Sequence, residues 1–197
     1  MAIIRSLIAV FFLFLYLQAD AMPKDSCKSS SSFNIGGIKI IDPYEISLKD
    51  ILATINQFYK EFKGGREFLQ KADGYLVFPN IYKAGFIIGG SYGIGALVID
   101  GKITKYYKMY STSVGFQIGV QKRSLIIVFL TKEALNNFLN KSEWKVGVDG
   151  SISILNWNKG TDINSIDMKK DIVAIPFNSK GIMVNLTLEG TVFQQIR

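Results

Sequence analysis

The chain has 197 residues, the length of one domain with a short appendage, and 48% of them are hydrophobic against 20% charged. This composition excludes a disordered chain and permits a buried core without metal or disulfide support. The sequence has no histidine and one cysteine, Cys27, which excludes histidine-dependent catalytic pairs, histidine-ligated metals and internal disulfides. The formal net charge of +7 favours an anionic partner.

Residues 1–21 have the pattern of an export signal. Arg5 precedes an unbroken apolar run of eleven residues at 7–17, whereas a membrane-spanning helix needs about 20. Ala19 and Ala21 are small residues at the two positions that a signal peptidase recognises. We expect cleavage after Ala21 and a periplasmic or secreted protein, with peripheral membrane association possible; a retained interfacial anchor is the alternative. Residues 22–45 are predicted as a flexible leader, and 46–197 as the folded domain.

Helical signals come first in the predicted domain. Ser47 and Asp50 resemble a capping box. The positions after them repeat at helical spacing and predict an amphipathic helix that ends at Gly64 and Gly65; the apolar stripe is Ile51, Ile55, Phe58 and Phe62. A second short helix is predicted over 67–72, and a third is predicted from a cap at Thr131 through residue 139.

From Gly74 onward the hydrophobic period changes to two, which predicts half-buried antiparallel strands. Alternation is clear at 114–121, 144–154 and 182–192, and the continuous apolar run at 125–130 predicts a central strand buried on both faces. Hairpin turns are predicted at 100–101 and 179–181, and a long surface loop at 156–170.

A glycine-rich segment at 85–95 could be taken for a phosphate-binding loop. It has neither the G-x-G-x-x-G spacing nor the Gly-Lys-Ser/Thr ending that such loops need, and a strand follows it. Glycines within strands usually mark bulges or close backbone approach. Gly89, Gly90 and Gly93 are therefore interpreted as structural, with close approach to a ligand as the alternative.

Two acidic residues, Asp149 and Glu189, lie on polar strand faces and could act as an acid–base pair. The interpretation that we favour is that both carboxylates are solvated. We therefore expect no enzyme.

Lysines at 102, 105 and 108 flank tyrosines at 106, 107 and 110, and Lys122 and Arg123 are placed at a turn. Lysine beside tyrosine suits a lipid headgroup interface, because the ring is amphipathic and the amine meets phosphate. Ordinary solvation and protection of a sheet edge are the alternative. The apolar stripe of the first helix could likewise insert into a membrane or pack as core.

Five blocks of sequence, in order over about residues 50–193, resemble one known family. They are Phe68-Leu69-x-x-Ala72 leading into 74–79, the glycine-rich strand at 83–98, the G-x-Q-x-G strand at 113–121, and segments at 147–151 and 181–190. The family is the SYLF domain, a lipid-binding family that includes a yeast actin-patch protein and exported bacterial proteins. This chain departs from the family pattern at 103–107 and near 156–160, and it stops short of the usual ending.

The resemblance implies an exported, non-catalytic protein that binds phospholipid, with anionic lipid as the natural target. The predicted fold class is α+β, a strongly curved antiparallel β-sheet with an N-terminal amphipathic helix and short additional helices. We expect no cofactor, no metal and no nucleic-acid partner, although a protein partner is possible. The alternatives are a structural or interaction module of the cell envelope and, third, a small outer-membrane β-barrel, which needs about eight strands of 9–11 residues. The candidate lipid-binding residues are Lys102, Lys105, Tyr106, Tyr107, Lys108, Phe58, Phe62, Gly89, Gly90 and Gly93.

Overall fold

The computed structural model describes residues 33–35, 38–40, 46–85, 88–114, 119–155, 170–180 and 188–196. The chain divides into two compact units, Met1–Ile41 and Asp42–Arg197. In the first unit, β1 (Phe33–Ile35) and β2 (Ile38–Ile40) pair antiparallel, within the segment predicted as a leader. The predicted signal peptide lies outside the described residues.

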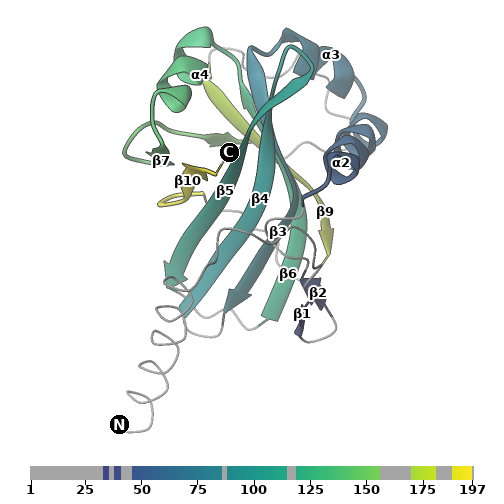
Figure 1. Ribbon diagram of the computed structural model, residues 1–197, viewed down its shortest axis with the longest axis vertical. Coiled ribbons are helices and arrows are strands. Elements are labelled where there is room, and N and C mark those ends of the chain that lie inside the picture. The colour runs from purple at the N-terminus through teal and green to yellow at the C-terminus, as the bar shows by residue number, and fades with distance from the viewer. Residues whose placement is uncertain are drawn as a thin grey trace, which may run out of the picture. The chain divides into compact units, whose positions relative to one another are not determined.

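The second unit is built on one sheet, whose described part has eight strands in the order β7-β10-β5-β4-β3-β6-β9-β8 (Figure 1). Four long strands form its centre, and Figure 1 shows them curling strongly along their length. Every described neighbouring pair is antiparallel except β8 and β9, which are parallel. The predicted α+β class with a strongly curved sheet is confirmed, and the antiparallel prediction fails at this one edge. The strands are β3 (Gly74–Gly85), β4 (Ile88–Ile99), β5 (Lys102–Val114), β6 (Gly119–Phe129), β7 (Glu143–Lys145), β8 (Ser153–Ile154), β9 (Ile172–Lys180) and β10 (Val192–Gln195).

Three helices belong to this unit within the described residues: α2 (Leu48–Glu61), α3 (Gly65–Lys71) and α4 (Lys132–Leu139). The predicted capping box is present, because the amide of Asp50 donates to Oγ of Ser47 at 3.2 Å and the Asp50 carboxylate accepts from the Ser47 amide at 3.3 Å. The hydroxyl of Thr131 caps α4 by accepting from the amide of Ala134 at 3.2 Å. All three predicted helices are confirmed, with small differences at their ends.

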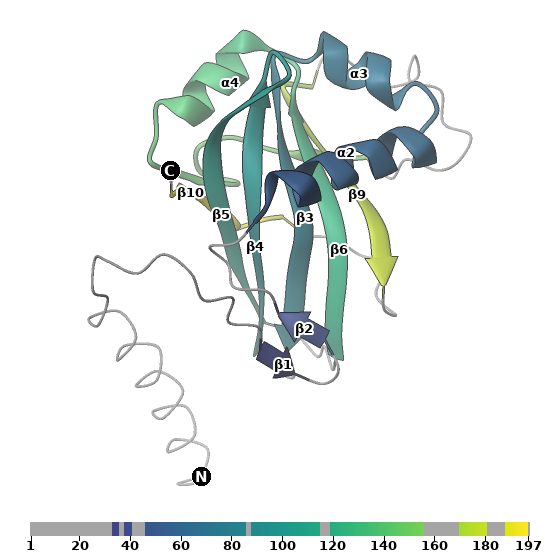
Figure 2. The same ribbon diagram turned by 45° about the vertical axis from the view of Figure 1, so that its right-hand side comes forward.

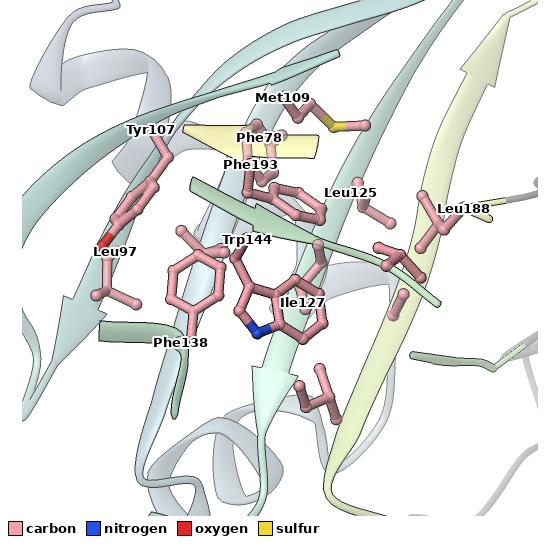
Figure 3. Packing of buried hydrophobic residues seen from close by; sticks show 14 of the residues in the cluster. Phe78, Leu97, Tyr107, Met109, Leu125, Ile127, Phe138, Trp144, Leu188 and Phe193 are labelled. Carbon is pink, nitrogen blue, oxygen red and sulfur yellow. The ribbon is translucent and has the colours of Figure 1, made fainter. Parts of the chain in front are cut away.

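The sheet is buried on both faces over its α-covered half. Helices α2 and α3 cover one face and α4 covers the other (Figure 2). Side chains therefore alternate between two cores along each central strand: Val77 faces α2, whereas Leu76 and Phe78 face the α4 side. Figure 3 shows the second core, in which Trp144, Phe138 and Phe193 are packed together. The predicted central strand is confirmed, because Leu125–Phe129 are at most 1% exposed.

The predicted continuous strand at 144–154 is wrong. The chain turns after β7, because the amide of Asp149 bonds the carbonyl of Lys145 at 2.9 Å and Gly147 adopts a left-handed φ of 85°. The Asp149 carboxylate also accepts from the Lys145 amide at 2.6 Å, so a side chain takes a backbone donor from the sheet. Val148 is consequently 72% exposed instead of buried. The other predicted alternating segments fall largely on 115–118 and 181–187, outside the described residues, as does the loop at 156–169.

An extra residue interrupts β3 around Pro79. The β3–β4 register shifts between Val77 and Asn80, and the β3–β6 register shifts at the same place. Proline suits such a bulge because it lacks the N–H that a regular ladder needs. The carbonyl of Pro79 accepts from the hydroxyl of Ser124 at 2.8 Å, which satisfies the displaced backbone. Beyond this bulge, odd-numbered residues of β3 replace even-numbered ones on the α4 side.

The bulge brings the backbone of β3 close against β4. A Cβ at Gly95 would lie 2.4 Å from the carbonyl oxygen of Val77 and 2.6 Å from Cδ1 of Phe78. Both neighbours are held in the core, so neither can yield easily. The glycine is therefore required by close approach within the sheet.

We expect Gly95→Ala to lower the free energy of unfolding by about 1–3 kcal/mol, because the added methyl overlaps fixed backbone. Gly90→Ala, in the same strand, is the control, since its Cβ would meet one neighbour, the Ser111 carbonyl oxygen, at 3.2 Å. Urea denaturation of both variants measures the difference. Equal midpoints would show that β3 and β4 separate more freely than this packing allows.

Candidate functional site

The predicted apolar stripe of α2 is core. Phe58 is fully buried and Phe62 is 5% exposed, and their ring centroids lie 5.6 Å and 6.0 Å from that of Phe177 on β9. These side chains therefore stabilise the sheet and do not lie on its surface. The large apolar side chains of α2 that are exposed are Leu48 and Leu52, at 57% and 49%.

The Lys–Tyr segment predicted as one binding surface is divided between the two faces of β5. Tyr107 is 1% exposed and lies among the α4-side core residues of Figure 3, where burial raises the pKa of its hydroxyl to about 12. Tyr106 packs partly against the opposite core. Lys105 donates from Nζ to Oε1 of Gln195 at 3.0 Å. Strand β5 lies between β4 and β10, so neighbouring positions point apart instead of forming a continuous basic edge. Lys102, at the start of β5, is exposed beside the hairpin turn.

The glycines of β4 serve packing in the described structure. A Cβ at Gly93 would lie 3.0 Å from both the Asn80 carbonyl oxygen and Cγ1 of Ile81. Gly89 is buried, and Gly90 faces the Ser111 carbonyl. These contacts favour the structural interpretation of the three glycines over ligand contact.

A row of tyrosines crosses the sheet beyond the bulge, on the same side as α2. In the strand register, Tyr82 of β3 pairs with Tyr92 of β4, which pairs with Tyr110 of β5. Directly paired residues share a face, so the three rings line up across three strands. Tyr92 is 38% exposed and the other two are half-buried. We call these residues the tyrosine row.

Lysines stand at both ends of the tyrosine row. Lys122 of β6 pairs with Tyr82 in register, and its Nζ lies 5.8 Å from the centroid of that ring. Nζ of Lys108 lies 6.0 Å from the centroid of Tyr110. Both distances are within cation–π range. Burial raises the pKa of Tyr110, as does the hydrogen-bonded carboxylate of Glu143, so the ring stays neutral at physiological pH.

The tyrosine row was missed at the level of sequence, although part of the signal was present. Lys108 was among the predicted residues, but Tyr82 and Tyr92 were not. Gly85 of β3 pairs with Gly89 of β4, so antiparallel pairing places Tyr82, three residues before Gly85, opposite Tyr92, three residues after Gly89. The prediction that Lys122 and Arg123 lie at a turn is wrong, because both are within β6.

The possible acid–base pair of Asp149 and Glu189, which the sequence allows but does not favour, gains no support from the surroundings of Asp149. Asp149 forms an ion pair with Lys141. The hydrogen bond from Lys141 lowers the pKa of the Asp149 carboxyl, so that group stays ionised and does not serve as a general acid.

An acidic cleft of about 270 Å³ lies beside Asp149, between α4 and the turn after β7. Glu133 and Asp171 also line it, and their charges would repel a phosphate. Within the described residues, no cluster of acidic or sulfur side chains could hold a metal ion.

We expect Phe58→Ala to lower the free energy of unfolding by about 3–5 kcal/mol, because it empties a fully buried site. Leu52→Ala, on the exposed side of the same helix, should change it by less than about 0.5 kcal/mol. Thermal or urea unfolding of the two variants decides between core and surface. Similar stabilities would mean that the stripe does not pack on the sheet.

Comparison with known families gives one match in the part of the chain from β5 onward. Residues 110–197 match the model of a family described as Ysc84, Las17-binding protein actin regulator. This match confirms the SYLF resemblance predicted from the sequence; the blocks before residue 110 lie outside the matched range. Comparison with curated proteins gives no match. None of the described helices is both long enough and apolar enough to cross a bilayer.

Proposed function

We propose, from the match of residues 110–197 to the SYLF/Ysc84 family model, that this chain is a binding protein that associates with anionic phospholipid at a membrane surface. The family description names a binding activity, which favours a binding module over an enzyme. The observation that carries the lipid partner is the tyrosine row with Lys108 and Lys122 beside it.

Tyrosine and lysine together suit the chemistry of a headgroup layer. A tyrosine ring is apolar along its body and polar at its tip, so it is stable where acyl chains meet water. A lysine extends an aliphatic stem past the ring and presents its amine to phosphate. Each lysine near an anionic surface contributes about 1 kcal/mol to binding. In the described structure these residue types lie together on one face, which an ordinary solvated sheet surface does not require.

The exposed side of α2 adds an apolar element on the same side of the sheet. Leu48 and Leu52 lie on that side with Lys49 and Ala53 beside them. A short apolar surface flanked by a lysine suits shallow insertion at the boundary between headgroups and acyl chains. This surface replaces Phe58 and Phe62 as the part of α2 that would contact a membrane.

The lipid surface is proposed to be reached after export. The n-region, apolar run and Ala-x-Ala site at 1–21 support a cleaved signal, and the protein would then meet anionic lipid of the cell envelope. Its net charge is unchanged by cleavage, because the removed segment contains one arginine and one aspartate.

Vesicle sedimentation tests the lipid proposal. Vesicles of phosphatidylglycerol and phosphatidylcholine should bring down the full chain, whereas pure phosphatidylcholine should not. Lys108→Glu combined with Lys122→Glu should reduce binding to the anionic vesicles at least roughly tenfold, because two attractive charges become repulsive. Added salt should weaken wild-type binding.

The matched control reverses two charges outside the tyrosine row, Lys71→Glu with Lys132→Glu, at the ends of α3 and α4. It carries the same change in net charge and should keep most of the binding. Equal loss in both double variants would show that net charge alone attracts the protein. Binding to neither vesicle would favour the alternative, a protein-interaction module of the envelope.

N-terminal sequencing of the exported protein tests the processing step. We expect the mature chain to begin at Met22. An intact Met1 in the exported fraction, or protein retained inside the cell, would contradict export through a cleaved signal.

A further inference from the structure

A polar cluster occupies the α4 side of the sheet beyond the bulge, where strand alternation would otherwise continue the core. Arg123 and Gln121 of β6 share the parity of Leu125, which is core on this face. Lys83 of β3 pairs with Gln121 in register and with Ser91 of β4 on its other side. Ser91 in turn pairs with Ser111 of β5, so a polar row crosses four strands on one face. The members of the polar cluster are Gln121, Arg123, Lys83, Ser91 and Ser111.

Arg123 is a buried cation that lacks a counter-charge in the described part of the chain. It is 5% exposed, and its Nη2 donates one hydrogen bond, of 2.7 Å, to Oε1 of Gln121. A guanidinium carries five N–H donors, and this is the one hydrogen bond found for them among the described residues. The fully buried polar atoms without a partner in this part of the chain are the hydroxyls of Tyr82, Tyr107 and Thr191, so no guanidinium nitrogen is a sealed, unsatisfied donor. The one ion pair found within the described residues joins Lys141 to Asp149, away from β6. A buried charge in this condition is costly unless something else pairs with it.

Lys83 brings a second positive charge to the same face. Ile81 pairs with Arg123, so Lys83 is the diagonal neighbour of Arg123 on the adjacent strand. Burial lowers the pKa of the Lys83 amine, and the charge of Arg123 lowers it further. Burial alone lowers the pKa of Arg123. The two partly desolvated cations therefore repel each other, and a bound anion would relieve both the repulsion and the lost hydration.

We propose that Arg123 and Lys83 form a binding site for a phosphate-type oxyanion, the phosphate of a soluble ester or of a phospholipid headgroup. The guanidinium provides a planar fork that matches two phosphate oxygens, and the amine provides a compact charge. The hydroxyls of Ser91 and Ser111 continue the row as neutral donors. Lys83 and both serines are half-buried, so the ligand would enter at their end and reach the buried guanidinium last.

The polar cluster is distinct from the tyrosine row. The two lie on opposite faces of the same strands, because successive residues of a strand point apart. Lys122 and Arg123 are adjacent in sequence, and one serves each face. Loss of one site therefore need not impair the other.

The effect of Arg123→Met on the melting temperature distinguishes a purely structural arginine from one that binds a ligand. If Arg123 supported the fold, Arg123→Met would lower the melting temperature in any buffer. If Arg123 binds an anion instead, Arg123→Met removes a buried charge that has no counter-charge among the described residues. The melting temperature of the variant in chloride should then equal or exceed that of the wild type. The same variant then loses the stabilisation that phosphate gives to the wild type.

The experiment is thermal unfolding of the full chain at constant ionic strength, in chloride and with three probes. The probes are sodium phosphate, glycerol phosphate and monomeric dioctanoyl phosphatidylglycerol. We expect at least one probe to raise the wild-type melting temperature in a saturable way. Arg123→Met and Lys83→Met should each weaken the apparent affinity at least tenfold, whereas Lys132→Met, an exposed lysine of α4, should leave it unchanged.

The three probes separate the sources of the phosphate. Stabilisation by sodium phosphate or glycerol phosphate supports a soluble ester, and stabilisation by the lipid alone supports a headgroup. The proposal is overturned if no probe shifts the wild type, or if Arg123→Met shifts as the wild type does. If Arg123→Met does not fold, Lys83→Met, at a half-buried position, decides: a shift in melting temperature equal to that of the wild type overturns the proposal. Anionic vesicle binding that persists in a variant without the phosphate shift would show that the two sites act independently.

Discussion

The extra residue of β3 at Pro79 determines the chemistry of both faces of the sheet. Before it, Leu76 and Phe78 face α4; after it, odd-numbered residues take that face, whereas β4 and β6 keep their parity throughout. The bulge costs one regular ladder hydrogen bond, which the Ser124 hydroxyl replaces, and close approach to β4, which Gly95 permits. Without it, Lys83 would point toward α2 and away from Arg123, and Tyr82 would leave its alignment with Tyr92 and Tyr110.

Beyond the bulge, each face of the sheet carries cationic side chains beside amphipathic or polar partners, but the two faces differ in their exposure to solvent. On the α2 side, Lys108 and Lys122, both partly exposed, lie over the half-buried rings of Tyr110 and Tyr82. On the α4 side, Arg123 is buried beside one amide. A hydrated lysine can contribute long-range attraction to a surface, whereas a desolvated guanidinium contributes short-range, directional bonds. If both proposals hold, one sheet offers a diffuse surface for attraction and a localised site for a phosphate.

Sequence reasoning succeeded where local signals agreed with tertiary structure, as at the Ser47 cap, the Thr131 cap and the Asp100 turn. It also found the resemblance to the family whose model matches residues 110–197. It failed where a pattern was compatible with two arrangements. Residues 75–78 are apolar at every position, so alternation could not show that β3 changes parity at Pro79. Helical spacing could not separate Phe58 from Leu52, since both are apolar. The strand at 144–154 was broken by Asp149, whose carboxylate takes a backbone donor. Arg123 had the parity of Leu125 and Ile127, a signal of burial that its neighbour Lys122 masked.

Ionic strength should act differently on the two proposed interactions, and this follows from burial alone. At physiological salt the Debye length is about 8 Å, so a partly exposed lysine such as Lys108 or Lys122 loses much of its attraction to a membrane as salt rises. The field between Arg123 and a bound phosphate passes through protein of low polarisability, where mobile ions do not enter, so it is screened much less. A protein with both would retain its phosphate at salt concentrations that release it from vesicles. If vesicle binding and phosphate binding used the same site, both would weaken with the same dependence on salt.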